Sequence, residues 1–138
     1  IGSDSNIRIS LSEEIRTLEY SQRLRDKSRA SLATEDKSTA RRIFDKILTG
    51  GAKAANRKTG EIKVGKWADL ISLDETHTNL IQAEGDTILD CFIFSSDDNM
   101  VKDVWSAGRH QVKNGQHINR ENIISDYSKV IRELGELI

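Results

Sequence analysis

The stretch Gly60-Glu-Ile-Lys-Val-Gly-Lys-Trp-Ala-Asp-Leu-Ile-Ser-Leu-Asp74 marks the point where the chain changes its hydrophobic period. Apolar and polar residues alternate over residues 61–64, Gly65 and Lys66 predict a turn, and residues 67–73 predict a strand. Alternation with a period of two residues is typical of a strand that buries one face. The stretch therefore predicts a strand–turn–strand unit, which separates a helical N-terminal part from a β-rich part.

Two amphipathic helices are predicted before this unit. Ser10 and Glu13 form a capping box that starts the first helix, which we expect to continue to about Arg29. The second helix is expected from about Thr39, with a broad apolar stripe that ends near Asn56. Each helix carries an apolar stripe, yet only a small β unit follows to cover both of them. We therefore expect that a partner layer is missing from this chain.

The β-rich part is predicted to consist of short strands and to close with a helix. Residues 89–94 are a candidate for a buried strand, and residues 101–107 and 110–113 predict a hairpin. Asn114-Gly115 is a strong turn signal, because both positions of the tightest hairpin turn need a positive φ. A last helix is expected from about Asn119. The predicted order is a turn, two helices, roughly five or six short strands and a helix.

The composition predicts a soluble globular protein. The 138 residues carry a net charge of −1, with 36% hydrophobic and 31% charged residues. This balance gives no electrostatic attraction to nucleic acid or to an anionic lipid surface. No run reaches the roughly 18 apolar residues of a membrane span, and no secretory signal peptide opens the chain. We therefore expect a cytoplasmic protein that binds neither nucleic acid nor membranes.

Few residues of this chain are candidates for catalysis or metal binding. Asp4 lies in a Gly/Ser turn, where a carboxylate can ligate a metal or shuttle a proton, although an Asp in such a turn also commonly satisfies its own backbone. The three histidines form no H-x-H pair and no other local metal motif. Cys91 is the only cysteine, so neither an intrachain disulfide nor a cysteine-based metal site can form. The residues alone indicate an α+β unit with one notable carboxylate.

Four segments resemble the amidohydrolase superfamily, and they occur in the order in which that family has them. The 60–74 stretch is similar to the segment where those chains return from the barrel to a small β-sandwich, and residues 101–115 are similar to its closing hairpin. Residues 2–5 match the end of the eighth barrel strand, and residues 40–56 match the Gly/Ala-rich helix before the sandwich.

The resemblance implies an α+β fragment of a metal-dependent hydrolase. Residues 1–56 would form the C-terminal end of a (β/α)₈ barrel, with its last strand turn and helices. Residues 57–118 would form most of the C-terminal part of a small β-sandwich domain, and residues 119–138 a final helix. Such a barrel needs about 250 residues, so the N-terminal barrel is expected to be missing.

The run Leu18-Glu-Tyr-Ser-Gln-Arg-Leu-Arg-Asp26 narrows the resemblance to the formimidoylglutamate deiminases. The implied activity of the full-length protein is metal-dependent hydrolysis of N-formimino-L-glutamate to N-formyl-L-glutamate and ammonia in histidine degradation. Two alternatives stay open. One is another aminohydrolase, either a nucleobase deaminase or a chlorohydrolase-like enzyme, and the other is a non-catalytic α+β module that binds a partner through its helices.

The resemblance also implies roles around Asp4. Asp4 would ligate one divalent metal, which we expect to be zinc, and would carry a proton. Ser3, Ser5 and Asn6 are candidates to hold its carboxylate, by position only. The family's histidine ligands and catalytic glutamate have no counterpart here, so the fragment is expected to hold no metal and to be inactive. The implied partners are a small-molecule substrate, the missing barrel and, at full length, a second copy in a homodimer.

Overall fold

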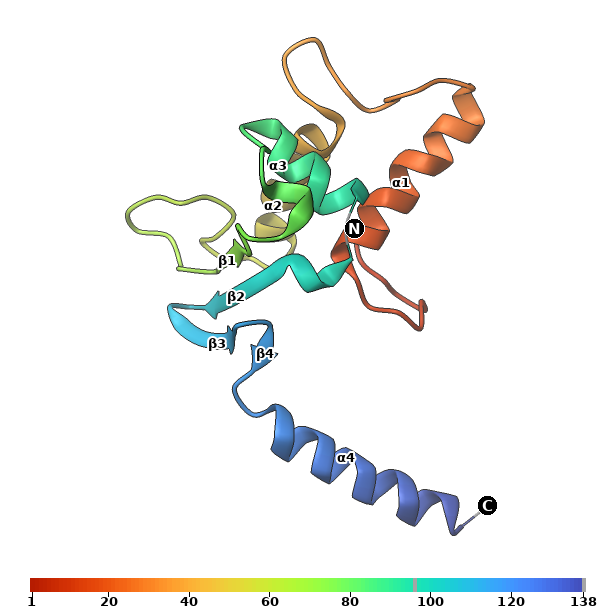
Figure 1. Cartoon of the computed structure of the whole chain (residues 1–138), viewed down its shortest axis with the longest axis vertical. Coiled ribbons are helices and arrows are strands. Elements are labelled where there is room, and N and C mark those ends of the chain that lie inside the picture. Colours follow the sequence, from red (N-terminus) through yellow and green to blue (C-terminus); the bar gives the residue numbers. More distant parts are fainter. Residues whose placement is uncertain (96, 138) are drawn as a thin grey trace.

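The computed structural model describes residues 1–95 and 97–137 of the chain. The helices and strands of these residues are α1 (Leu11–Asp26), α2 (Thr39–Ala54), β1 (Leu70–Leu73), α3 (Asp86–Asp90), β2 (Val101–Ser106), β3 (Arg109–Lys113), β4 (Gln116–His117) and α4 (Arg120–Gly135). Short 3₁₀ turns lie at Thr78–Leu80 and Asp98–Met100, and a π-helical turn lies at Cys91–Ser95. In Figure 1, α1, α2 and α3 gather on one side of the sheet, and α4 extends away at the other end.

Serine caps start α1 and α2, near the positions where the sequence predicts these helices to begin. The Ser10 hydroxyl accepts a hydrogen bond from the Glu13 N–H at 3.3 Å, and the Ser38 hydroxyl accepts one from the first turn of α2 at 3.2 Å. Each bond satisfies a main-chain donor that has no partner inside the helix. α1 ends before the predicted Arg29, because Lys27 adopts a left-handed conformation with φ of 50°.

The sheet is antiparallel, with strand order β1-β2-β3-β4. The predicted hairpin is confirmed, and its turn at Ala107-Gly108 has φ values of 52° and 78°. The predicted turn at Asn114-Gly115 is also confirmed, with φ values of 49° and 75°. Two successive positive φ values give the turn whose twist matches that of the flanking strands. Four strands form in the described residues, instead of the five or six that the sequence predicted.

The strand–turn–strand prediction for the 60–74 stretch is wrong in its first half. Residues 61–64 form no strand and lead irregularly into a turn at residues 64–65, and the strand predicted over residues 67–73 forms only from Leu70 onward. Ile62 and Val64 are 91% and 102% exposed, so no layer in the described structure buries their side chains. A strand of alternating residues needs such a layer to bury its apolar face, and the alternation is therefore not sufficient here.

The strand predicted at residues 89–94 is also wrong. These residues are the end of α3 and the π-helical turn that continues it. Phe92 and Ile93 are buried, at 4% and 0% exposed, in the core that α1 and α2 also line. A short apolar run fits a buried helix as well as a buried strand, so the periodicity cannot separate the two, and packing against the long helices decides the outcome.

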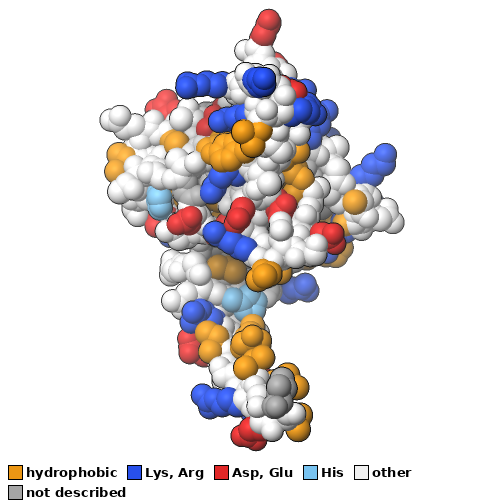
Figure 2. Space-filling view, turned by 90° about the vertical axis from the view of Figure 1, so that its right-hand side faces the viewer, with side chains coloured by type: hydrophobic (Ala, Val, Ile, Leu, Met, Phe, Trp, Pro, Cys, Tyr) orange, Lys and Arg blue, Asp and Glu red, His pale blue; other side chains and the backbone are white. Residues whose placement is uncertain are grey.

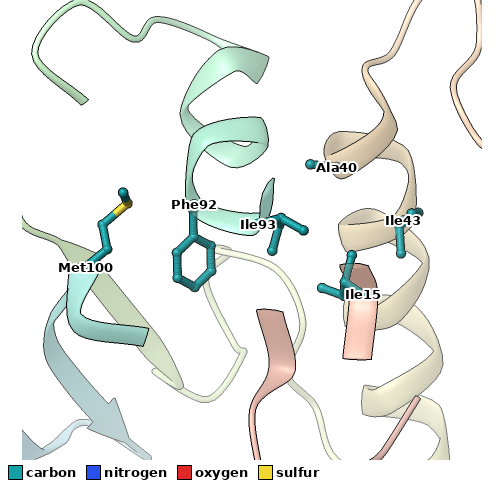
Figure 3. Close-up of a cluster of buried hydrophobic side chains, with 6 residues drawn as sticks. All are labelled: Ile15, Ala40, Ile43, Phe92, Ile93 and Met100. Atoms are coloured by element: carbon teal, nitrogen blue, oxygen red, sulfur yellow. The ribbon is translucent and has the colours of Figure 1, made fainter. Parts of the chain in front are cut away.

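A small core joins the N-terminal helices to the later part of the chain. Its members come from α1, α2, the π-helical turn and the 3₁₀ turn before β2, and they are Ile15, Ala40, Ile43, Phe92, Ile93 and Met100 (Figure 3). In Figure 3, Ile15 and Ile43 face Ile93 across the contact between the helices. Residues 1–56 and 57–118 thus share one core, and the predicted division of the chain into three parts stays a prediction.

The predicted last helix is confirmed as α4, and it leaves its apolar side chains exposed. α4 has no buried residue and projects from the rest of the molecule with hydrophobic side chains along it (Figure 2). These side chains belong to Ile123, Ile124, Tyr127, Val130, Ile131 and Leu134. Among the described residues, no helix combines the length and the apolar character that crossing a membrane would require.

Candidate functional site

Asp4, the predicted site residue, lies in a turn ahead of α1. The Asn6 N–H donates to the Ser3 carbonyl at 2.7 Å and closes this turn. Asp4 itself has a φ of 43°, in the left-handed region that Asp adopts more readily than most residues. Its side chain is exposed, and within the described residues no hydrogen bond or ion pair engages its carboxylate. The turn therefore presents a carboxylate that no other described residue of the chain engages.

The three residues predicted to hold Asp4 take different positions. Ser3 is half-buried and closes the turn through its carbonyl, whereas Ser5 is exposed. Asn6 Nδ2 donates to Glu14 Oε1 at 2.6 Å and so ties the turn to the first part of α1. Among the described residues, no hydrogen bond joins a side chain of these three residues to the Asp4 carboxylate, and their role toward Asp4 stays a prediction.

A polar cluster that the sequence analysis missed follows the turn. Asp98 Oδ1 accepts hydrogen bonds from the hydroxyls of Ser10 and Ser12, each at 2.8 Å. Arg8 lies between two carboxylates, with Nε 3.0 Å from Glu13 Oε2 and Nη2 3.6 Å from Asp98 Oδ2. Glu13, which a capping box would direct to the Ser10 N–H, thus pairs with Arg8. No local signal identifies Asp98, because its partners lie 86 and 88 residues away in the sequence.

The pKa of Asp98 reflects this cluster. Partial burial raises the pKa of Asp98, but the hydrogen bonds from Ser10 and Ser12 and the charge of Arg8 together outweigh that effect. The pKa of Asp98 therefore lies below its ordinary value. Asp98 is anionic at neutral pH and can accept hydrogen bonds from both hydroxyls at once.

The histidines serve local structure. His110 Nε2 lies 2.9 Å from Asp103 Oδ1, and His77 and His117 each accept a nearby main-chain N–H through Nδ1, at 3.3 and 3.1 Å. Across residues 1–95 and 97–137, no group of three or more His, Cys, Asp or Glu could hold a metal ion. Zinc takes about three or four protein ligands. Asp4 fits one of these positions by its chemistry, and the described residues bring no further ligands to it.

Known proteins with similar sequences or structures decide the family. The model of the amidohydrolase family matches residues 1–110, which include the Asp4 turn, the three helices α1–α3 and the strands β1 and β2. The chain belongs to the amidohydrolase family. The resemblance found in residues 2–5, 40–56, 60–74 and 101–115 is thereby confirmed at the level of the family.

Individual amidohydrolases match nearly the whole chain. The formimidoylglutamate deiminase of Pseudomonas aeruginosa is 42% identical over 135 residues, which are 97% of this chain and 30% of that protein. The crystal structure of an amidohydrolase from Brucella melitensis matches 97% of this chain and 29% of its own, with a TM-score of 0.83 and 40% identity.

A solved structure with a lower sequence identity shares the fold. An adenosine deaminase from Xanthomonas campestris, solved with bound zinc, matches 99% of this chain and 30% of its own, with a TM-score of 0.77. Its sequence identity of 22% means that this likeness concerns the fold alone. The chain spans about 30% of the length of each of these relatives.

Proposed function

We propose that this chain is part of a longer metal-dependent deiminase that hydrolyses N-formimino-L-glutamate to N-formyl-L-glutamate and ammonia, a reaction of histidine degradation. The observation that supports this is the 42% identity to the Pseudomonas aeruginosa formimidoylglutamate deiminase over 97% of the chain. Because that match covers only 30% of the relative, the activity is proposed for the longer protein. The 138-residue chain alone is expected to be inactive, since it supplies one candidate ligand.

Asp4 is the proposed catalytic residue of this chain. Its exposed carboxylate is an oxygen ligand of the kind that zinc accepts. Zinc, when bound, lowers the pKa of a water molecule and so supplies a nucleophile at neutral pH. Asp4 would hold the metal through its carboxylate and take the proton that the water loses. The water oxygen would add to the formimino carbon, and the carbon–nitrogen double bond would become a single bond as Asp4 returns its proton to that nitrogen. The second proton of the water would then leave the new hydroxyl for the same nitrogen. The carbon–nitrogen bond would break, releasing ammonia and leaving the oxygen as the formyl carbonyl.

We assign residues 1–56 to the C-terminal end of a (β/α)₈ barrel, residues 57–118 to a β-sandwich portion and residues 119–138 to a C-terminal helix. Barrels of this kind carry their active sites at the carboxyl ends of the strands. The position of Asp4 in a turn a few residues ahead of α1 supports the assignment, since the end of a barrel strand leads through a loop into a helix in the same way.

The remaining parts of the proposal rest on the family resemblance. Zinc is the proposed metal, and the Xanthomonas campestris adenosine deaminase was solved with that ion. The substrate is a small molecule, the longer protein forms a homodimer, and it works in the cytoplasm without nucleic acid or membrane partners.

Substitution of Asp4 in the longer protein tests the proposal. Asp4→Ala removes the ligand, and Asp4→Asn keeps the shape but cannot take up a proton, so both should slow ammonia release from N-formimino-L-glutamate by about 10³-fold or more. Asp36→Asn is the matched control, because Asp36 is also exposed and accepts its hydrogen bond locally, from Thr34 Oγ1. Near-normal turnover by the Asp4→Ala enzyme would refute the assignment. Deamination of a nucleobase in place of N-formimino-L-glutamate would favour another aminohydrolase.

A further inference from the structure

A cluster of three oxygens joins the start of α1 to the segment that leads into β2. Asp98 lies in the 3₁₀ turn before β2, and its Oδ1 accepts both the Ser10 and the Ser12 hydroxyl at 2.8 Å. The two hydroxyls lie 3.1 Å apart, and the serines are only 4% and 2% exposed. Hydrogen bonds from hydroxyls to an ionised carboxylate are stronger than neutral ones, and water has little access to these donors. The cluster is therefore a firm attachment between two segments far apart in the sequence.

Arg8 adds a weaker contact on the outer side of the cluster. The Arg8 side chain is 58% exposed and that of Asp98 is 48% exposed, and Arg8 Nη2 lies 3.6 Å from Asp98 Oδ2. Ion pairs with this much solvent contribute little, because water screens the charges and the long side chain loses freedom. The attachment of this segment therefore depends chiefly on Ser10 and Ser12.

The Asp4 turn depends on this attachment for its position. Ile7 and Ile9 are 103% and 86% exposed, so the residues between the turn and α1 contribute no apolar packing there. In the described part of the chain, side-chain hydrogen bonds and ion pairs reach from residues 1–9 to other segments only through Asn6 and Arg8. Asn6 reaches α1 itself, so the placement of the turn relative to the sheet follows from how the start of α1 is held. Ile15 packs in the core further along the helix, and Asp98 holds the residues nearest the turn, Ser10 and Ser12.

We infer that Asp98 is a positioning residue for the catalytic turn, which holds the Asp4 carboxylate in place by anchoring Ser10 and Ser12. The inference rests on the proposed function of Asp4. Asp98 needs no contact with the substrate or the metal in this role. Displacing a catalytic group by roughly 1 Å can cost about 10²-fold in rate, so loss of the anchor should act on turnover more than on substrate binding.

A set of variants separates the anchor from a general loss of stability. Asp98→Ala removes the acceptor, whereas Asp98→Asn keeps one acceptor oxygen and removes the charge. Ser12→Ala removes one of the two donors and leaves Ser10, the helix cap, intact. Asp36→Asn is the matched control, since Asp36 is an exposed aspartate that accepts a hydroxyl within its own loop.

The measurements are made on the longer protein that contains this chain. Amide hydrogen exchange of residues 5–14 reports the anchor directly, metal analysis reports bound zinc, and ammonia release gives kcat and KM. Asp98→Ala should speed exchange at residues 5–14 by about tenfold or more and lower kcat by about 10²-fold, with KM changed less than about threefold. Ser12→Ala should also speed exchange and lower kcat, but by smaller factors. Asp98→Asn should keep most of the kcat and of the exchange protection that Asp98→Ala loses.

The double variant Asp98→Ala/Ser12→Ala should be no worse than Asp98→Ala alone, because both changes remove the same hydrogen bond. Unchanged exchange at residues 5–14 in Asp98→Ala would overturn the inference. Faster exchange with unchanged kcat and metal content would also overturn it, because the cluster would then be structural only. If Asp98→Ala does not fold, Asp98→Asn and Ser12→Ala supply the same comparison. Failure of the proposed function looks different, since Asp4→Ala would then retain turnover whatever the Asp98 variants do.

Discussion

Glu19 is the buried carboxylate whose replacement should destabilise the chain strongly. Its side chain is 0% exposed, yet it lies on α1 among residues that face solvent. Oε1 accepts hydrogen bonds from Arg23 Nε and from the Ser31 N–H, each at 2.8 Å. Oε2 accepts the Leu32 N–H at 3.1 Å. The carboxylate thus ties the second half of α1 to the loop that leads into α2.

The free energy of unfolding should fall by about 3 kcal/mol in Glu19→Ala. Two main-chain N–H groups of the loop lose their acceptor, and each loss costs about 1–3 kcal/mol. Arg23 stays 35% exposed and regains water, so its ion pair adds little to the total. Glu19→Gln keeps one acceptor oxygen but turns an NH₂ group toward one of the loop N–H donors. The free energy of unfolding of that variant should fall by about 1–2 kcal/mol.

Urea denaturation followed by circular dichroism measures both losses, and amide exchange at Ser31 and Leu32 should accelerate in parallel. Glu133→Gln is the matched control, because Glu133 is exposed on α4 and lies 3.9 Å from Lys129 Nζ. It should change the free energy of unfolding by less than about 0.5 kcal/mol. Equal urea midpoints for Glu19→Ala and Glu133→Gln would refute the reasoning that a buried carboxylate holds this loop.

Two further predictions concern a tight turn and acid. Gly60 and Gly65 share a φ of +86°, but only a Cβ at residue 60 would collide, 2.7 Å from the Leu48 carbonyl oxygen. Gly60→Ala should therefore lower the free energy of unfolding by about 1–3 kcal/mol more than Gly65→Ala does. Equal urea midpoints for the two variants would contradict this. The free energy of unfolding should also fall below about pH 4. Carboxylates whose pKa is lowered in the fold stabilise it fully above their unfolded pKa of about 3.9. They lose that effect as the pH falls through their pKa in the folded state. These carboxylates include Asp69, Asp74, Asp98 and Asp103. A melting temperature that stays constant from about pH 5 to about pH 2.5 would count against that expectation.

The features that sequence reasoning predicted correctly depend on residues close together in the chain. The Ser10 cap acts on the Glu13 N–H, and the Asn114-Gly115 turn needs only the positive φ values of those two residues. Such signals involve one or two neighbouring peptide units, so the local sequence determines nearly all of the interactions that form these features. The start of α1, the hairpin and α4 could therefore be predicted without a tertiary structure.

The features that sequence reasoning missed depend on distant partners. Residues 89–94 are helical because Phe92 and Ile93 pack with α1 and α2, and no periodicity within the run reports that packing. Asp98 meets Ser10 and Ser12 only after the chain has folded. Asp4 was predicted through a family resemblance, since its own turn is equally consistent with an Asp that satisfies its backbone.

Asp98 contacts the start of α1 and Glu19 lies in its second half, and this separates their expected effects. Asp98 anchors the residues that follow the Asp4 turn, whereas Glu19 holds the loop after the helix. Glu19 variants should therefore lower the free energy of unfolding while leaving amide exchange at residues 5–12 close to that of the parent under native conditions. Asp98 variants should show the reverse balance, with faster exchange at those residues and a smaller change in global stability. If both sets of variants loosened residues 5–12 equally, α1 would move as one body, and Asp98 would have no special control over the Asp4 turn.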